Sequence, residues 1–142
     1  MGLFDFFEKE KNNKTAEEWY ELAITYGNNN RYDDAINALR KALRINSEQA
    51  GVWYNLGIAY FKTYRNNDAI DACLQALRIN PNIDDAWSII GRVYIDLNRY
   101  NEALEAFSQT LRINPDHIRA WYDLGVSLYR LNRYDDAIEA YL

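Results

Sequence analysis

The sequence predicts an all-α solenoid, in which antiparallel pairs of helices are repeated along the chain. Three observations support this prediction. The tryptophans recur at intervals of 34 residues, at Trp19, Trp53, Trp87 and Trp121. The tetrapeptide Leu-Arg-Ile-Asn returns in the same register at 43–46, 77–80 and 111–114. Only 2 prolines and 6 glycines occur among the 142 residues, so long stretches are free to be helical.

Composition and charge restrict the class of function. Hydrophobic residues make up 49% and charged residues 26%, which is typical of a soluble globular protein. The net charge of -5 disfavours nucleic-acid binding, which relies on a basic surface. The single Cys73 excludes an internal disulfide framework. No apolar run approaches the ~20 residues that cross a bilayer, and the N-terminus lacks signal-peptide features, so we expect a cytoplasmic protein.

Residues 1–14 precede the first repeat and are expected to form a separate N-terminal arm. The arm begins apolar and ends charged and rich in asparagine. It is either a frayed segment or short helix lying on the first repeat, or a docking segment for a lipid surface or another molecule's groove. Lipid is the weaker alternative, because the segment is short and its net charge is zero.

The first repeat is predicted to contain two helices. Thr15 is a suitable N-cap, with Glu18 completing a capping-box pattern, and the helix is expected to run to about Tyr26. Gly27 and the asparagines after it are expected to end this helix. The apolar stripes of the two helices are Trp19, Leu22, Ala23 and Tyr26, and then Ala35, Ile36, Leu39, Ala42 and Leu43.

The same pair of helices is predicted three more times. The stripes of the later first helices are Trp53, Leu56, Gly57 and Tyr60; Trp87, Ile90, Gly91 and Tyr94; and Trp121, Leu124, Gly125 and Leu128. Pro81 and Pro115 follow two of the second helices, where a proline is expected because it cannot continue a helix. In this register every tryptophan faces the core.

These units resemble tetratricopeptide repeats, whose first helix carries a large residue, Leu, Gly or Ala, and Tyr. Ala, an aromatic residue, Ala and Pro follow in the second helix. The resemblance implies a right-handed solenoid of antiparallel helix pairs over residues 16–142, with three full repeats and a truncated fourth. The repeats are 16–49, 50–83, 84–117 and 118–142. Departures such as Ser47, Leu39, Cys73 and Thr110 are local and do not threaten the fold.

The fourth repeat stops early, because its second helix ends at Tyr141-Leu142. In repeat arrays the last unit is usually followed by a helix with a polar outer face. An open apolar end is therefore expected near Ala137, Ile138, Tyr141 and Leu142. Either the sequence belongs to a longer array, or this end stacks on another molecule and produces a homo-oligomer.

Catalytic chemistry finds no support in the sequence, so we expect no enzyme activity. His117 is expected to be solvent-exposed or to cap a helix, and Cys73 to be buried. No zinc or calcium pattern and no phosphate-binding glycine motif occurs, so no catalytic residue, metal or cofactor is predicted. The arginines before each second helix are expected to be structural and to pair with acids of a neighbouring repeat. They are Arg31, Arg65, Arg99 and Arg133.

The resemblance implies that the first helices line a concave groove that holds a peptide. The groove candidates are Tyr20, Ile24, Tyr54, Asn55, Ile58, Phe61, Lys62, Ser88, Arg92, Arg119, Tyr122, Val126, Tyr129 and Arg130. Tyrosine anchors with arginine nearby are typical of binding hot spots. We expect Tyr20, Tyr54 and Tyr122 to matter most.

One sub-class of this family grips the C-terminal carboxylate of chaperones with a Lys/Asn/Asn/Lys/Arg set. The corresponding residues here are Tyr20, Ile24, Asn55, Asp85 and Ile89, of which only Asn55 fits. Chaperone-tail binding is therefore disfavoured. The leading hypothesis is a non-enzymatic interaction scaffold that binds a protein segment in its groove. The alternatives are a self-assembly unit that acts through its uncapped C-terminal end, and an accessory domain of a longer protein.

Overall fold

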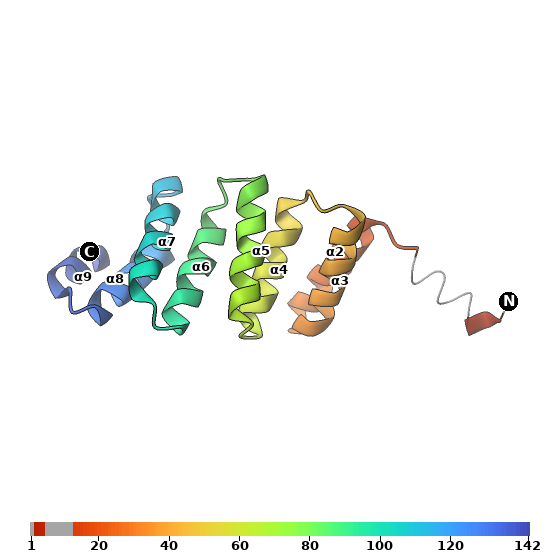
Figure 1. Ribbon diagram of the computed structural model, residues 1–142, viewed down its shortest axis with the longest axis horizontal. Helices are drawn as coiled ribbons and strands as arrows, with labels where there is room; N and C mark the ends of the chain where they lie inside the picture. Colours follow the sequence, from red (N-terminus) through yellow and green to blue (C-terminus); the bar gives the residue numbers. More distant parts are fainter. Residues whose placement is uncertain (1, 5–12) are drawn as a thin grey trace.

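The computed structural model describes residues 2–4 and 13–142, and from residue 16 onward the chain forms a row of paired α-helices (Figure 1). The pairs are α2 (Ala16–Asn28) with α3 (Tyr32–Ile45), α4 (Ala50–Lys62) with α5 (Asn66–Ile79), α6 (Asp84–Asp96) with α7 (Tyr100–Ile113), and α8 (Ile118–Arg130) with α9 (Tyr134–Tyr141). The described residues contain no β-strand. The all-α solenoid predicted from the sequence is confirmed.

The packing of the helices gives the row an inner and an outer side. Each helix packs mainly on its partner within the pair and on the next helix along the chain. Helix α6 also contacts α4 and α8, whereas α5 makes no contact of that extent with α3 or α7. The first helices of the second, third and fourth pairs therefore lie closer together than the second helices do, and Asn55 of α4 donates a hydrogen bond to Tyr20 of α2. This places α2, α4, α6 and α8 on the inner, concave side of the solenoid.

Close helix contacts depend on small residues in the first helices. A Cβ atom on Gly57 would lie 2.5 Å from the Cys73 sulfur, and one on Gly91 would lie 2.6 Å from the ring of Phe107. Phe107 is fully buried and is the largest such side chain among the described residues. Glycine at these positions therefore lets the second helix of each pair approach the first.

The turns inside the four pairs share one geometry. A left-handed residue, with φ of 58–59°, lies two positions after the end of each first helix, at Asn30, Tyr64, Asn98 or Asn132. The next N–H then donates to a carbonyl of the helix; for example, Arg31 donates to Tyr26 at 2.9 Å. This bond satisfies a carbonyl that the end of the helix would otherwise leave free. Helix α2 runs to Asn28, two residues beyond the expected Tyr26, and it ends within the predicted glycine and asparagine segment, where Asn30 adopts the left-handed conformation.

One turn differs from the other three in its side chains. The tyrosine hydroxyl donates to the asparagine Oδ1 two residues earlier in the pairs Tyr32/Asn30, Tyr100/Asn98 and Tyr134/Asn132. In the second helix pair the two residue types are exchanged. Tyr64 there is 80% exposed, and the buried Oδ1 of Asn66 has no partner among the described residues.

The tryptophans are less uniform than predicted. Trp19 is 6% exposed and belongs to the core, whereas Trp121 is 40% exposed, so the expectation that every tryptophan faces the core is wrong there. Helix α9 has 8 residues, compared with 14 in α7, and therefore covers less of the surface around Trp121. Trp53 and Trp87 are half-buried and line clefts on the outer side, not the inner one.

The predicted helix cap at Thr15 is present, and the arginines before the second helices form ion pairs, mostly within their own helix pair. Thr15 accepts a hydrogen bond from the Glu18 N–H at 3.1 Å, which confirms it as the N-cap of α2. Of the four arginines before the second helices, Arg65 pairs with the preceding unit, through Asp33 at 3.1 Å. The other three pair with an acid three residues later in their own helix.

Residues 5–12 of the expected N-terminal arm lie outside the described residues, so the docking hypothesis for that arm stays a prediction. Within the part of the chain that the structure describes, none of the helices combines the length and the apolar character needed to span a membrane.

Candidate functional site

The candidate residues predicted from the sequence all lie on α2, α4, α6 and α8, the helices of the inner side. Six are exposed, namely Ile24, Lys62, Arg119, Tyr122, Tyr129 and Arg130. Seven are half-buried, namely Tyr20, Tyr54, Asn55, Ile58, Phe61, Arg92 and Val126. Ser88 is buried and so is a poor candidate for contact with a partner. The inner side is therefore an aromatic and basic surface on which some candidate side chains are exposed and others are half-buried.

A cavity of about 210 Å³ lies at the N-terminal end of this surface. It is lined by residues of α2, α3 and α4. One of the α2 residues is Gly27, and a Cβ atom added to Gly27 would have no heavy atom within 4 Å. The candidates Ile24, Asn55, Ile58 and Lys62 contribute to its walls. The cavity was not predicted, although the sequence held a signal: Phe61, Ile95 and Tyr129 occupy the position of Gly27 in the other repeats.

Beside the cavity, Tyr20 is held by the next helix pair. The Nδ2 group of Asn55 donates to the Tyr20 hydroxyl at 2.8 Å and to the Gly51 carbonyl at 2.9 Å. An added Cβ on Gly51 would lie 3.5 Å from that hydroxyl, so the small residue leaves room for the phenol. These contacts fix the orientation of Tyr20 without a partner present, which reduces the entropy lost on binding.

The middle of the inner side is formed by Tyr54, Phe61 and Arg92. The guanidinium of Arg92 lies over the Phe61 ring, 4.7 Å from its centroid, which is a cation–π arrangement. Burial raises the pKa of Tyr54 to about 12, with the nearby carboxylate of Asp85 adding to the effect. Tyr54 and Phe61 also pack against the core between the second and third pairs. This part of the surface is therefore firmly packed.

The C-terminal end is filled with aromatic side chains. Tyr129 packs edge-on against Tyr134, with ring centroids 5.3 Å apart, and Tyr122 lies 5.9 Å from Tyr141. Arg119 pairs with the buried carboxylate of Asp123 at 3.0 Å and also lies over Tyr122. The two ends of the inner side therefore differ: one has a cavity and the other has exposed rings.

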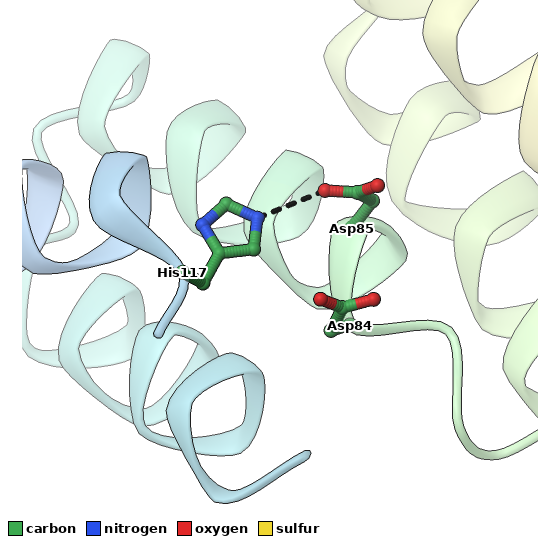
Figure 2. A group of neighbouring side chains, drawn as sticks. All are labelled: Asp84, Asp85 and His117. Carbon is green, nitrogen blue, oxygen red and sulfur yellow. Dashed lines mark hydrogen bonds and ion pairs between the residues drawn. The ribbon is translucent and has the colours of Figure 1, made fainter. Parts of the chain in front are cut away.

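A cluster of Asp84, Asp85 and His117 joins α6 to the start of α8 (Figure 2). The His117 Nδ1 accepts from the Ala120 N–H at 3.0 Å, which confirms His117 as a helix cap. The proton of the neutral ring is then on Nε2, which donates to Asp85 Oδ1 at 2.8 Å. Asp84 accepts from Asn114 at 2.9 Å. Because both ring nitrogens and Asp84 are already engaged, the cluster is a hydrogen-bond network between two helix pairs.

The stacked pairs, with first helices on the inner side, define the protein as an α-solenoid, a class with an extended concave binding surface. The family model described as tetratricopeptide repeat matches residues 10–82 and 90–142. The chain therefore belongs to the tetratricopeptide-repeat family, and the resemblance found in the sequence is confirmed. The search of curated proteins gave no match.

Solved structures share the fold over most of the chain. One crystal structure of MamA has a TM-score of 0.88 and 29% identity, with 96% of this chain and 79% of that chain covered. Another has a TM-score of 0.87 and 30% identity, with 94% and 72% covered. The first TPR of Spaghetti (RPAP3), bound to the HSP90 peptide SRMEEVD, has a TM-score of 0.80 and 23% identity, with 83% and 94% covered.

Proposed function

We propose that the protein is a non-enzymatic scaffold that binds an extended protein segment along its inner side. The observation that carries this proposal is the surface of α2, α4, α6 and α8, which has a largely apolar cavity at one end and exposed tyrosines and basic residues at the other. Large rigid aromatic side chains and arginines are the residue types that dominate binding energy at interfaces. The working unit is residues 16–142, and we propose that it acts in the cytoplasm.

Membership of the tetratricopeptide-repeat family supports the proposal, because repeat solenoids use their concave surfaces for binding. The structure of the RPAP3 domain was solved with a peptide bound, which shows that one protein of this fold holds a peptide. The proposed segment for the present chain is not a chaperone tail. Asn55, the one residue that fits the carboxylate-binding set, already donates to Tyr20 and Gly51.

Selection of short random peptides on the full chain tests the proposal. Enriched peptides are titrated against the wild type, Tyr122→Ala and Ile24→Ala, and we expect each substitution to weaken binding about tenfold, as for a moderate hot spot. Leu74→Ala is the matched control, because Leu74 lies on α5 and is 44% exposed, compared with 42% for Ile24. Equal weakening by Leu74→Ala and the two inner-side substitutions would contradict the proposal.

A second candidate function is self-association through α8 and α9. The favouring observation is a group of exposed apolar side chains on this end of the solenoid, namely Ile118, Trp121, Ile138 and Leu142. A surface cavity of about 510 Å³ lies among residues of the two helices. Sedimentation of the wild type and of Ile138→Glu tests this candidate. A concentration-dependent oligomer that Ile138→Glu dissociates supports it, and a wild-type monomer at all concentrations contradicts it.

A further inference from the structure

We propose that the cavity between α2, α3 and α4 receives a leucine-sized apolar side chain of the bound segment, and that Lys62 pairs with a carboxylate beside it. This inference rests on the proposed function, because it names the chemistry that one part of the same groove selects. It also gives that part a different role from the aromatic surface at α8.

The cavity exists because Gly27 has no side chain. Gly27 lies inside α2 with ordinary helical geometry, and an added Cβ would meet no heavy atom within 4 Å. In the fourth pair the corresponding residue, Tyr129, fills this place and packs on Tyr134. The first pair keeps the tyrosine equivalent to Tyr134, since Tyr32 lines the cavity, but lacks the ring that would cover it.

The lining of the cavity favours an apolar group. Ala23, Ala35, Leu39 and Ala59 are buried residues that line it, each with an aliphatic side chain. Its volume is about 210 Å³. A dry apolar cavity of roughly 150 Å³ is large enough to bind benzene, so this space can accept a branched aliphatic side chain. A leucine side chain would remove its own surface and that of the cavity wall from water.

The charge beside the cavity favours an acidic neighbour. Lys62 is the only residue with a formal charge among those that line the cavity. It is exposed, and no ion pair joins it to another described residue. Two other basic candidates differ, because Arg92 lies on the Phe61 ring and Arg119 pairs with Asp123. Arg130 lies on α8, at the other end of the inner side. Lys62 is therefore available to a carboxylate of the bound segment.

Three short peptides test the inference by nitrogen-15 NMR titration of the full chain. They are the capped tetrapeptides Ser-Leu-Glu-Ser, Ser-Ala-Glu-Ser and Ser-Leu-Gln-Ser. We expect the leucine peptide with glutamate to shift the Gly27 amide and to bind about tenfold or more tightly than its alanine counterpart. We expect it to bind about two- to fivefold more tightly than the glutamine counterpart, because an exposed ion pair contributes little.

Variants of the protein connect these preferences to the cavity. Gly27→Leu fills the space and is expected to weaken binding of Ser-Leu-Glu-Ser about tenfold or more. Gly27→Ala is the matched control, because it makes a similar change in helix propensity while leaving most of the space open. Lys62→Gln is expected to remove the preference for glutamate over glutamine and to keep the preference for leucine over alanine. Thermal unfolding establishes that each variant is folded.

The outcomes separate this inference from the proposed function. Equal binding of the leucine and alanine peptides, or unchanged binding by a folded Gly27→Leu variant, overturns the role of the cavity. If a library-selected peptide is then still weakened by Tyr122→Ala, which lies far along the groove on α8, the proposed function stands without this inference. If neither Gly27→Leu nor Tyr122→Ala affects that peptide, both proposals fail.

Discussion

The first and third helix pairs both place a glycine in the first helix, but the two glycines have opposite surroundings. An added Cβ on Gly27 would meet no heavy atom within 4 Å, whereas one on Gly91 would lie 2.6 Å from the Phe107 ring. Gly27 faces the cavity on the inner side, and Gly91 faces the second helix of its own pair. The same residue type therefore leaves space for a ligand in one pair and brings two helices together in another.

This difference shows that the helices repeat more faithfully than the side chains between them. The position of Gly27 is occupied by Phe61, Ile95 and Tyr129 in the other three pairs. Arg92 lies on Phe61 and Tyr134 packs against Tyr129, so the groove is covered in those places. A common backbone therefore carries a surface that changes along its length from a cavity to exposed rings.

The largest expected effect concerns Gly91, the glycine in close contact with the second helix of its pair. Gly91→Ala adds a Cβ that overlaps the buried Phe107 ring, so the helices of the third pair must move apart or the ring must leave its rotamer. Such overpacking typically costs about 1–3 kcal/mol. Urea denaturation of the wild type and the variant measures the change in the free energy of unfolding. A variant as stable as the wild type would show that the contact is not tight.

In the second pair the glycine, Gly57, faces the Cys73 sulfur, so we expect the stability of the protein to depend on pH through this thiol. Burial raises the pKa of Cys73 from 9.0 to about 12. The unfolded chain therefore loses the thiol proton first, and stability falls as the pH rises from about 9 to 12. The expected loss is about 2 kcal/mol by roughly pH 10.5.

Cys73→Ala removes this titration and serves as the control, because other groups also ionise at alkaline pH. The unfolding free energy of each protein is measured by urea denaturation at neutral pH and at about pH 10.5. We expect the wild type to lose more stability than Cys73→Ala. Equal losses in the two proteins would mean that the thiol is solvated well enough to ionise in the folded state.

The third prediction compares the turn of the second pair with the other three. Tyr64 has a φ of 59°, a conformation that costs a residue with a large side chain about 1–2 kcal/mol. The buried Oδ1 of Asn66 also lacks a partner among the described residues. Exchanging the two residues, as Tyr64→Asn with Asn66→Tyr, restores the arrangement of the other turns. We expect stability to rise by about 1–2 kcal/mol.

The single substitution Tyr64→Asn separates the two contributions, since it relieves the backbone without supplying a partner for Asn66. Its thermal midpoint is expected to lie between those of the wild type and the double variant. A double variant that is less stable than the wild type would show that the second pair has no room for a tyrosine beside Phe61. In that case the tyrosine would occupy position 64 because the interior cannot accommodate it at position 66.

The sequence predicted the repeated part of the structure well, because repetition depends on local patterns. The Thr15 cap and the burial of Trp19 follow from spacing within one helix. The features that were missed depend on contacts between helices. The cavity at Gly27 requires the faces of α2, α3 and α4 together, and the network of Asp84 and His117 joins residues about 30 positions apart.

The smallest expected effect concerns Gly27, the glycine that faces the cavity. Gly27 is helical and an added Cβ there meets nothing, so Gly27→Ala should restrict the unfolded chain without straining the folded one. We expect a gain of about 0.5–1 kcal/mol in the free energy of unfolding, opposite in sign to Gly91→Ala. Parallel urea titrations of the two variants measure both changes. If Gly27→Ala destabilises the protein, the space beside α2 is closed in solution, and a cavity that is closed cannot receive a side chain.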